Sequence, residues 1–521
     1  MTNHDLPLGC ACCGMSRRAV LTAGCATCFS GLLPLGRTVF GADSTGKMRI
    51  RVFFILMGPV MPVAGWPNIG YDYRPGMEEI TNGLNNGCPD IDFVYTMAEQ
   101  PEQIKEIVDA DAEKIDGYIV VQMMCRGNQA VNPVLASGKP VLFTDFHYCG
   151  SFPFLSHTAR RLRLKTPNFA FISPSRTSDL VEAARCFKLA EKEGDLQAFV
   201  DGVAKVRRER APSDIDLSCA EDKLDLLSTS QLIEALKGTK VLAVGNNVGT
   251  DEQLKQSLGI EIIPTQFAEL NDEWTKADND QAKEVVTRWK SGAASISDVS
   301  EDTLEKSAKM YLAQKACLKR HGASAITINC LGGFYGKHIQ AYPCLGFHQL
   351  LNEGLVGACE CDIRSTVTML VMTTLTKGRP GYISDPVIDT STRQVIYAHC
   401  VASNKPFGPA GPANPFTILT HSEDRQGASV RSDLPVGYMT TTLEIASRRK
   451  EILFHQAKAV ANSTDDRACR TKLVAVPIGD MEKLFTEWDQ WGWHRVTYYG
   501  DLKEAVFALA DAIDWKVVEE A

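Results

Sequence analysis

Short apolar runs alternate with stretches of helical periodicity in the part of the chain that follows Met48. Four runs rich in β-branched and aromatic residues predict strands, and residues 101–108 between two of them predict a helix. The predicted strands are residues 49–56, 91–95, 117–121 and 140–143. Strands that alternate with helices are typical of a parallel sheet, so residues 48–175 are predicted to form an α/β domain.

The same alternation continues over residues 176–388 and then changes. Strands are predicted at residues 240–245, 260–263 and 325–328, with a helix near residues 251–258. Residues 389–521 are instead rich in β-branched residues and in Gly/Pro turns, which favours antiparallel pairing. The predicted fold is therefore α/β, with two Rossmann-like parallel α/β domains followed by a mainly antiparallel β C-terminal domain.

Two acidic residues flank a predicted strand-helix-strand unit inside the second domain. Glu360 follows an apolar run at residues 354–359, and Asp385 follows another at 381–384. Residues 363–376 between them predict a helix, for which Asp362 is a suitable N-cap. A crossover helix makes its flanking strands parallel, so both acids should meet at the carboxyl edge of one sheet. Two carboxylates at that edge suit a divalent cation such as Mg²⁺ or Mn²⁺.

The same acids also have a purely structural explanation. Glu360 and Asp362 would stabilise the positive end of the following helix, and Asp385 before Pro386 is a common turn starter. The pattern alone leaves both explanations open.

Three segments resemble the metal-binding region of L-fucose isomerase and its relatives. They are Cys359-Glu360-Cys361-Asp362-Ile363, Asp385 after its apolar strand, and residues 490–496, which contain Trp493 and His494. The resemblance implies that Glu360, Asp385 and His494 hold a catalytic Mn²⁺, with Glu360 and Asp385 also forming the acid/base pair. It further implies an aldose–ketose isomerase that works through an ene-diol.

The resemblance also implies a sugar pocket and a partner chain. His399, His421, Asn329 and Trp493 are the candidate substrate-binding residues, and either additional histidine could replace His494 as the ligand. A homo-oligomer, a trimer or a hexamer, is expected. The separation of Glu360 from Asp385 looks about one residue longer than in L-fucose isomerase itself, which leaves the sugar open.

Two other functions share these features. A metal lowers the pKa of bound water, so a glycoside-processing hydrolase is the nearest alternative chemistry. A non-catalytic exported sugar-binding protein is the other, because two α/β lobes also build such receptors.

Composition and the first residues predict where the protein works. An apolar share of 44%, a charged share of 23% and a net charge of -8 describe a soluble globular protein and argue against nucleic acid as a partner. Residues 1–42, with Ser16-Arg17-Arg18 before an apolar stretch, resemble a twin-arginine signal. The expectation is export through the twin-arginine translocase to the periplasm without an integral membrane span after processing, and a form lipid-anchored at Cys25 stays open. Twelve of the 17 cysteines lie beyond this segment, where they are predicted to be mostly buried thiols.

Overall fold

A computed structural model describes residues 46–127, 129–191, 195–246 and 249–521. The predicted export signal at residues 1–42 lies outside this part of the chain. Residues Met48–Ala521 form one compact unit.

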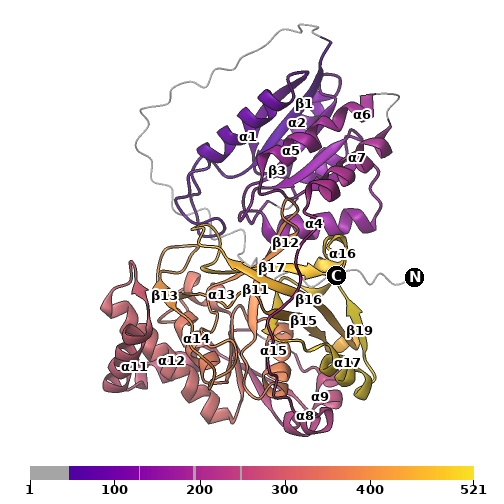
Figure 1. The fold of residues 1–521 in the computed structure, drawn as a ribbon. Coiled ribbons are helices and arrows are strands. Elements are labelled where there is room, and N and C mark those ends of the chain that lie inside the picture. The colour runs from indigo at the N-terminus through magenta and orange to yellow at the C-terminus, as the bar shows by residue number, and fades with distance from the viewer. Residues whose placement is uncertain (1–45, 128, 192–194, 247–248) are drawn as a thin grey trace, which may run out of the picture. The chain divides into compact units, whose positions relative to one another are not determined.

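The first half of this unit contains a five-stranded parallel sheet (Figure 1). Its strand order is β2-β1-β3-β4-β5, and the strands are β1 (Met48–Ile55), β2 (Ile91–Ala98), β3 (Gly117–Gln122), β4 (Val141–Asp145) and β5 (Phe169–Ile172). The connecting helices are α1 (Arg74–Gly87), α2 (Pro101–Asp111), α3 (Val131–Leu135), α4 (Ser151–Arg163), α5 (Thr177–Arg185), α6 (Phe187–Glu191) and α7 (Leu196–Arg210). The four predicted strands and the helix at residues 101–108 are confirmed, with small differences at their ends.

Both faces of this sheet are buried, as the apolar strands require. Ile50, Val52 and Phe54 of β1 pack in one core cluster with residues of α1, α5 and α7. Phe53 and Ile55 belong to a second cluster with residues of α2, α3 and α4. Successive side chains of a strand point to opposite faces, so a single apolar run can serve both cores.

A second parallel sheet has the order β10-β9-β6-β7. Its strands are β6 (Lys240–Val244), β7 (Glu261–Thr265), β9 (Ala325–Ile328) and β10 (Val356–Ala358). The helices along this stretch are α8 (Thr229–Leu236), α9 (Glu252–Leu258), α10 (Phe267–Lys276), α11 (Asn279–Gly292), α12 (Glu301–His321), α13 (Cys330–Tyr335), α14 (Cys344–Asn352) and α15 (Ile363–Leu375). The strand predictions for this region are also confirmed.

The C-terminal part forms a seven-stranded sheet in the order β15-β18-β11-β12-β17-β16-β19, and β15 also pairs with β16. Six of these strands pair antiparallel and form a barrel-like ring, to which β19 adds in parallel. The strands are β11 (Tyr382–Asp389), β12 (Gln394–His399), β15 (Met439–Ala446), β16 (Glu451–Asn462), β17 (Thr471–Ile478), β18 (Arg495–Tyr499) and β19 (Lys516–Glu519). The predicted antiparallel C-terminal region is confirmed.

Smaller elements complete the C-terminal part. A three-stranded sheet has the order β14-β13-β8. These elements are β8 (Ser295–Ile296), β13 (Phe416–Leu419), β14 (Ser429–Ser432), α16 (Glu482–Glu487), α17 (Lys503–Ala512), and the 3₁₀ turns η2 (Ser447–Arg449) and η3 (Trp488–Trp491).

The predicted crossover between Glu360 and Asp385 is wrong. The strand before Glu360, β10, belongs to the second parallel sheet, whereas β11, which contains Asp385, belongs to the antiparallel sheet. A short turn links β11 to β12, and such a hairpin pairs its strands antiparallel. The predicted domain limit at residue 388 thus falls at the end of a strand of the C-terminal sheet, while the division into three domains and the Rossmann-like description remain predictions.

The mixed α/β fold is thus confirmed in outline. Among the described residues, no helix combines the length and the apolar character that a membrane crossing needs.

Candidate active site

Three neighbouring strands bring two of the predicted metal ligands together. In the antiparallel sheet β11 lies between β18 and β12, with Ser384 opposite Arg495 and Asp385 opposite Ala398. His494 directly precedes β18, and His399 ends β12, so both rings lie near Asp385. Glu360 comes from the other side, two residues beyond β10. The site therefore lies where the carboxyl end of a parallel strand meets the antiparallel sheet.

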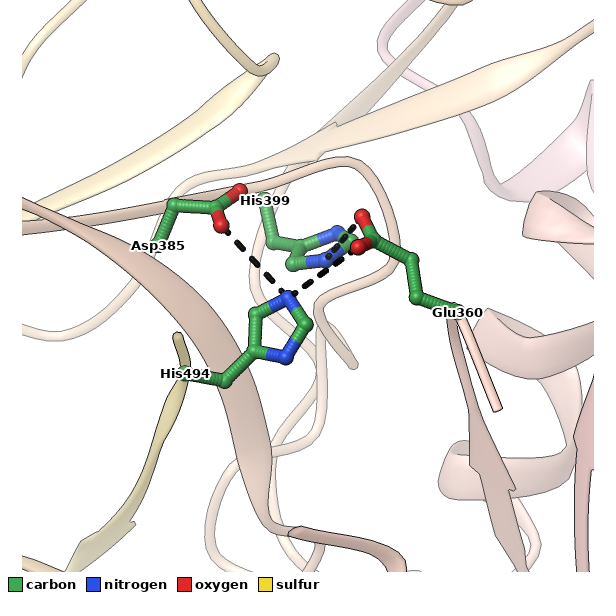
Figure 2. Close-up of side chains that lie close together, drawn as sticks. All are labelled: Glu360, Asp385, His399 and His494. Carbon is green, nitrogen blue, oxygen red and sulfur yellow. Dashed lines mark ion pairs between the residues drawn. The ribbon is translucent and has the colours of Figure 1, made fainter. Parts of the chain in front are cut away.

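Four side chains converge there (Figure 2). One ligand atom from each of Glu360, Asp385, His399 and His494 lies within 4.8 Å of the others. His494 Nε2 is 3.6 Å from Glu360 Oε2 and 3.5 Å from Asp385 Oδ1. His399 Nε2 is 3.9 Å from Glu360 Oε1. The structure thus brings together all three predicted ligands, and it adds His399.

The backbone at Glu360 is unusual. Glu360 and Cys361 both have positive φ, at 62° and 52°, a region that non-glycine residues seldom adopt. Such a conformation costs about 1–3 kcal/mol per residue and tends to occur at functional sites. It carries the chain from β10 directly into the N-cap of α15, and it presents the Glu360 carboxylate to the cluster.

Asp362 fixes the orientation of His494. Its Oδ1 accepts a hydrogen bond from the backbone N–H of Ser365, which confirms the predicted N-cap. Its Oδ2 lies 2.9 Å from His494 Nδ1. A proton held at Nδ1 by a carboxylate leaves Nε2 with a free lone pair when the ring is neutral, which is the form that binds a metal.

His399 has the opposite arrangement. The backbone N–H of Cys400 donates to His399 Nδ1 at 2.9 Å, so that nitrogen acts as the acceptor. In the neutral ring the proton then resides on Nε2, which faces Glu360. His399 is therefore arranged as a hydrogen-bond donor toward the site, and His494 as a ligand.

Burial and the neighbouring charges control protonation in the cluster. Burial and the nearby His494 lower the pKa of His399 to about 4, so its ring is neutral at pH 7. Burial raises the pKa of Asp385 well above its usual value. Burial also opposes charge on Glu360 and on His494, but the attraction between this carboxylate and the imidazolium outweighs it. Positive charge is thus favoured between the two carboxyl groups.

The donor set fits a divalent cation. Asp385 Oδ1, His399 Nε2 and His494 Nε2 are buried and have no hydrogen-bond partner among the described residues. Two carboxylates and one imidazole are a hard-to-borderline set of the kind that Mn²⁺ or Mg²⁺ accepts, and bonds of about 2.1 Å can bridge separations of 3.5–3.6 Å. The Glu360 side chain is 21% exposed, which leaves one open side for a substrate.

The four candidate substrate-binding residues lie in different settings. His399 lies in the cluster. Trp493 stacks its ring on Phe152, and its proximity to Asp385 partly offsets the effect of burial on the pKa of that residue. His421 pairs instead with Asp424 at 3.2 Å, and this contact helps to raise its pKa to about 9 although burial opposes it. Asn329 is occupied as the N-cap of α13. His421 and Asn329 are outside the four-residue cluster, and a substrate role for any of the four stays a prediction.

Sequence reasoning did not single out Glu423. Its carboxyl accepts a hydrogen bond from the Tyr335 hydroxyl at 2.8 Å, and burial raises its pKa. The charge of Glu360 adds to this shift, and the charge of Glu423 adds to the effect of burial on the pKa of Asp385. Burial and these three carboxylates also raise the pKa of the Cys125 thiol well above its usual value. Glu423 lies within the segment 420–424 that resembles the isomerase family, but nothing in the sequence distinguishes it from the adjacent Asp424.

Comparison with known proteins points to sugar isomerases. No family model matches the chain. A sulfoquinovose isomerase of Priestia aryabhattai is 24% identical over 228 residues, which are 42% of this chain and 50% of that protein. A sulfoquinovose isomerase of Clostridium sp. (strain MSTE9) is 21% identical over 300 residues, 55% of this chain and 66% of that protein.

The chain spans about half the length of the Priestia relatives that it matches. These curated relatives are isomerases by name, and they support the expected enzyme class without pointing to L-fucose isomerase in particular.

Solved structures add nothing to this comparison. A sugar ABC transporter from Yersinia enterocolitica covers 54% of this chain at 11% identity and a TM-score of 0.16. A carbohydrate transporter from Acidothermus cellulolyticus 11B covers 56% at 11% identity and a TM-score of 0.18. Such scores carry no argument about fold or function.

Proposed function

We propose that this protein is a divalent-cation-dependent aldose–ketose isomerase of the L-fucose isomerase type. The observation that carries the proposal is the convergence of Glu360 and Asp385 on His494, whose Nε2 lies 3.6 Å and 3.5 Å from their carboxylate oxygens. Low-identity relatives named as sugar isomerases support the reaction class.

Glu360, Asp385 and His494 would hold the cation, with Mn²⁺ as the expected ion. When bound, such a cation supplies a Lewis acid that polarises a carbonyl oxygen and acidifies the neighbouring C–H bond. The remaining roles belong to side chains of this protein.

The two carboxyl groups move the proton. One of Glu360 and Asp385 accepts the proton from C2 of the open-chain aldose, and the other carboxyl group donates a proton to O1, which gives an ene-diol. The first then returns its proton to C1, and the second takes the proton that O2 loses, so both groups end as they began. One C–H bond breaks and another forms, so the reaction needs no external oxidant or reductant. Burial of Asp385 and His494 keeps water away from this transfer.

His399 orients the substrate. Its Nε2–H faces the cluster next to Glu360 and would donate to a sugar hydroxyl or carbonyl oxygen. A neutral imidazole is suited to this task because it donates without competing with the cation for the site.

The substrate is proposed to be a monosaccharide aldose. Sulfoquinovose belongs in the first panel because the relatives are named for it, and L-fucose belongs there because of the sequence resemblance. Assembly as a trimer or hexamer and export to the periplasm by the twin-arginine route are also proposed.

The test is a ketose assay on the Mn²⁺-loaded protein with a panel of aldoses, run beside a panel of chromogenic glycosides. We expect ketose from at least one aldose, loss of that activity with a chelator and recovery with Mn²⁺. Release of chromophore without ketose would assign the hydrolase instead. No response in either panel from protein that binds Mn²⁺ tightly would contradict both enzymatic functions.

A further inference from the structure

A second cavity, of about 310 Å³, lies at the carboxyl edge of the N-terminal parallel sheet. It is lined by the ends of β3 and β4, by residues that follow β5, and by the first turns of α1. The strand order of this sheet reverses between β1 and β3, and open parallel sheets bind ligands outside the carboxyl ends of their strands at such a point. None of Glu360, Asp385, His399 and His494 lines this cavity.

Two buried polar groups in its wall lack protein partners. Thr144 is 1% exposed, and its Oγ1 has no hydrogen-bond partner among the residues that the structure describes. His147 Nδ1 is also buried and has no hydrogen-bond partner among the described residues. Both residues line the cavity, so a ligand there would satisfy groups that the fold leaves without protein contacts.

The carboxyl group of Asp145 is a third polar group in the lining. Its Oδ1 accepts a hydrogen bond from the backbone N–H of Gly150 at 2.9 Å. Burial raises the pKa of Asp145 well above its usual value and lowers that of His147 to about 4, so both side chains favour their uncharged forms. Uncharged carboxyl, imidazole and hydroxyl groups can each donate and accept hydrogen bonds.

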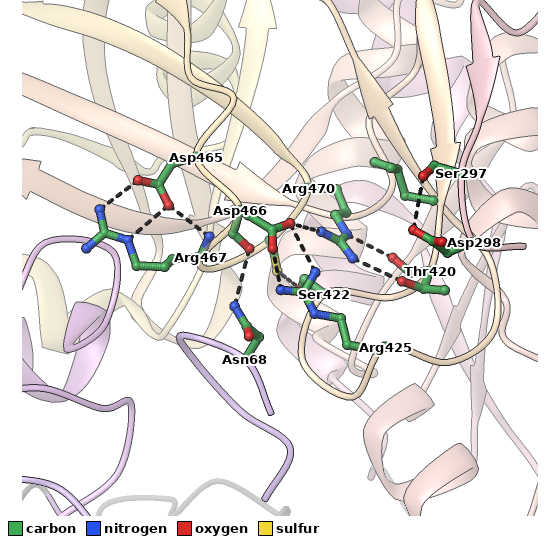
Figure 3. Close-up of polar contacts among 12 residues, drawn as sticks. Asn68, Ser297, Asp298, Thr420, Ser422, Arg425, Asp465, Asp466, Arg467 and Arg470 are labelled. Carbon is green, nitrogen blue, oxygen red and sulfur yellow. Dashed lines mark hydrogen bonds and ion pairs between the residues drawn. The ribbon is translucent and has the colours of Figure 1, made fainter. Parts of the chain in front are cut away.

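The charged side chains at the cavity already have partners within the protein. The Arg467 guanidinium forms two hydrogen bonds with the Asp465 carboxylate, at 2.9 and 2.6 Å (Figure 3). Glu79 accepts a hydrogen bond from the Thr177 hydroxyl at 2.5 Å. Arg467 is thus neutralised by Asp465, and Glu79 is exposed, so solvent screens its charge. Neither residue gives the cavity a strong preference for a charged ligand.

Aromatic surface completes the lining. Tyr71 and Phe146 both border the cavity, and the Arg467 guanidinium lies 5.4 Å from the centre of the Phe146 ring. Apolar faces beside donor-and-acceptor groups match a ligand that carries C–H surface between hydroxyl groups. The volume lies near the lower limit for small-molecule pockets, about 300 Å³, which excludes a dinucleotide.

We propose that this cavity binds a neutral polyhydroxylated molecule of about monosaccharide size, at a site independent of the cation cluster. Its hydroxyl groups would pair with Thr144, Asp145 and His147, and its carbon face would lie against Tyr71 or Phe146. A free sugar and a sugar alcohol share this chemistry.

The test is calorimetric titration of the full chain with D-sorbitol, D-glucose and glycerol in a His494→Ala background treated with chelator. This background disables the proposed active site, so the result does not depend on isomerase activity. We expect saturable binding of D-sorbitol or D-glucose and weaker binding of glycerol. Comparison of D-sorbitol with D-glucose shows whether the site prefers a sugar alcohol or an aldose.

Variants then locate the site. Thr144→Val and Asp145→Asn should each weaken binding at least tenfold, and Ser175→Trp at the exposed rim should abolish it without a change in the core. Thr158→Val is the matched control, because Thr158 is also a buried threonine without a hydroxyl partner among the described residues but does not line the cavity. The proposal is overturned if no polyol binds, if binding is lost in the His494→Ala background alone, or if Ser175→Trp and Thr144→Val bind as the control does.

Discussion

At the level of single residues, the two histidines of the cluster differ in which ring nitrogen is already engaged. Asp362 occupies Nδ1 of His494 as an acceptor, and the Cys400 N–H occupies Nδ1 of His399 as a donor. In the neutral rings, Nε2 of His494 therefore carries a lone pair and Nε2 of His399 carries a proton. This difference, rather than distance, is the basis for proposing that His494 binds the cation and that His399 binds the substrate.

His399→Ala should leave cation binding intact and lower the rate. Loss of one donor to a reacting oxygen typically lowers kcat by roughly 10²–10³-fold. Steady-state kinetics and a Mn²⁺ titration on the same preparation measure both effects. Loss of Mn²⁺ binding in this variant would make His399 a ligand and reverse the assignment.

Asp362→Asn should distinguish the two roles of Asp362, as the N-cap of α15 and as the partner of His494. Asparagine caps a helix as well as aspartate does, so the stability of α15 should change little. The variant loses the carboxylate that holds the His494 proton, and such changes typically cost about 10–100-fold in metal affinity or activity.

Asp278→Asn supplies the control for this experiment, because Asp278 caps α11 in the same way without contact to the cluster. Equal activity of the two variants would show that Asp362 acts only as a cap.

At the level of elements, a buried acid links α15 to the antiparallel sheet. Glu444 of β15 is fully buried, and the Ser365 hydroxyl donates to its Oε1 at 2.7 Å. The backbone N–H of Ser365 donates to Asp362 Oδ1, so this contact continues to His494. Burial, followed by the charge of Asp362, raises the pKa of Glu444 to about 8.

A raised pKa in the folded state gives stability that is complete below the unfolded pKa of about 4.3 and is lost as the pH rises through about 8. Glu444→Gln removes this titration. The stability difference between the wild type and Glu444→Gln should therefore shrink by at least about 1 kcal/mol between about pH 5 and pH 9. Urea denaturation at the two pH values measures it, and a constant difference would contradict a neutral Glu444.

The elements near the site show what the sequence could and could not predict. The strands around β1 and β6 and the Asp362 cap follow from local patterns, which residues close together in the chain determine. The partners of β11 are β12 and β18, and β18 lies more than a hundred residues away. No local pattern encodes that pairing, so the convergence of Glu360 and Asp385 was predicted from a crossover that the fold does not contain.

At the level of the whole molecule, a buried ion pair joins strands from distant parts of the C-terminal region. Arg495 of β18 is fully buried and lies 2.5 Å from Glu520, which follows β19. His455 of β16 contacts the same carboxylate at 3.0 Å. Burial opposes the charge on Glu520, but Arg495 and His455 outweigh it and lower the pKa of Glu520 to about 2.

Glu520→Gln should destabilise the protein by about 3–5 kcal/mol near neutral pH, because it leaves Arg495 buried without its charge partner. A lowered pKa gives stability that is present above the unfolded value of about 4.3 and lost as the pH falls through about 2. The difference in the free energy of unfolding between the wild type and Glu520→Gln should therefore become smaller at acidic pH.

Glu519→Gln is the matched control for denaturation measurements. Glu519 is the neighbour of Glu520 in the chain, and its carboxylate pairs with Lys503 at the surface. Surface ion pairs contribute about 0–1 kcal/mol to stability. Equal effects of the two substitutions would contradict the structural role of the buried pair.

The metal content of the purified protein tests most directly whether the four-residue cluster holds a cation. It is measured by elemental analysis after the protein has been reloaded with Mn²⁺ and dialysed. We predict a single bound ion per chain in the wild type and its loss in His494→Gln. His321→Gln, which changes a histidine that pairs with Glu269 away from the cluster, should retain the ion. An ion bound equally by both variants, or no bound ion in the wild type, would contradict the proposal that Glu360, Asp385 and His494 hold one cation.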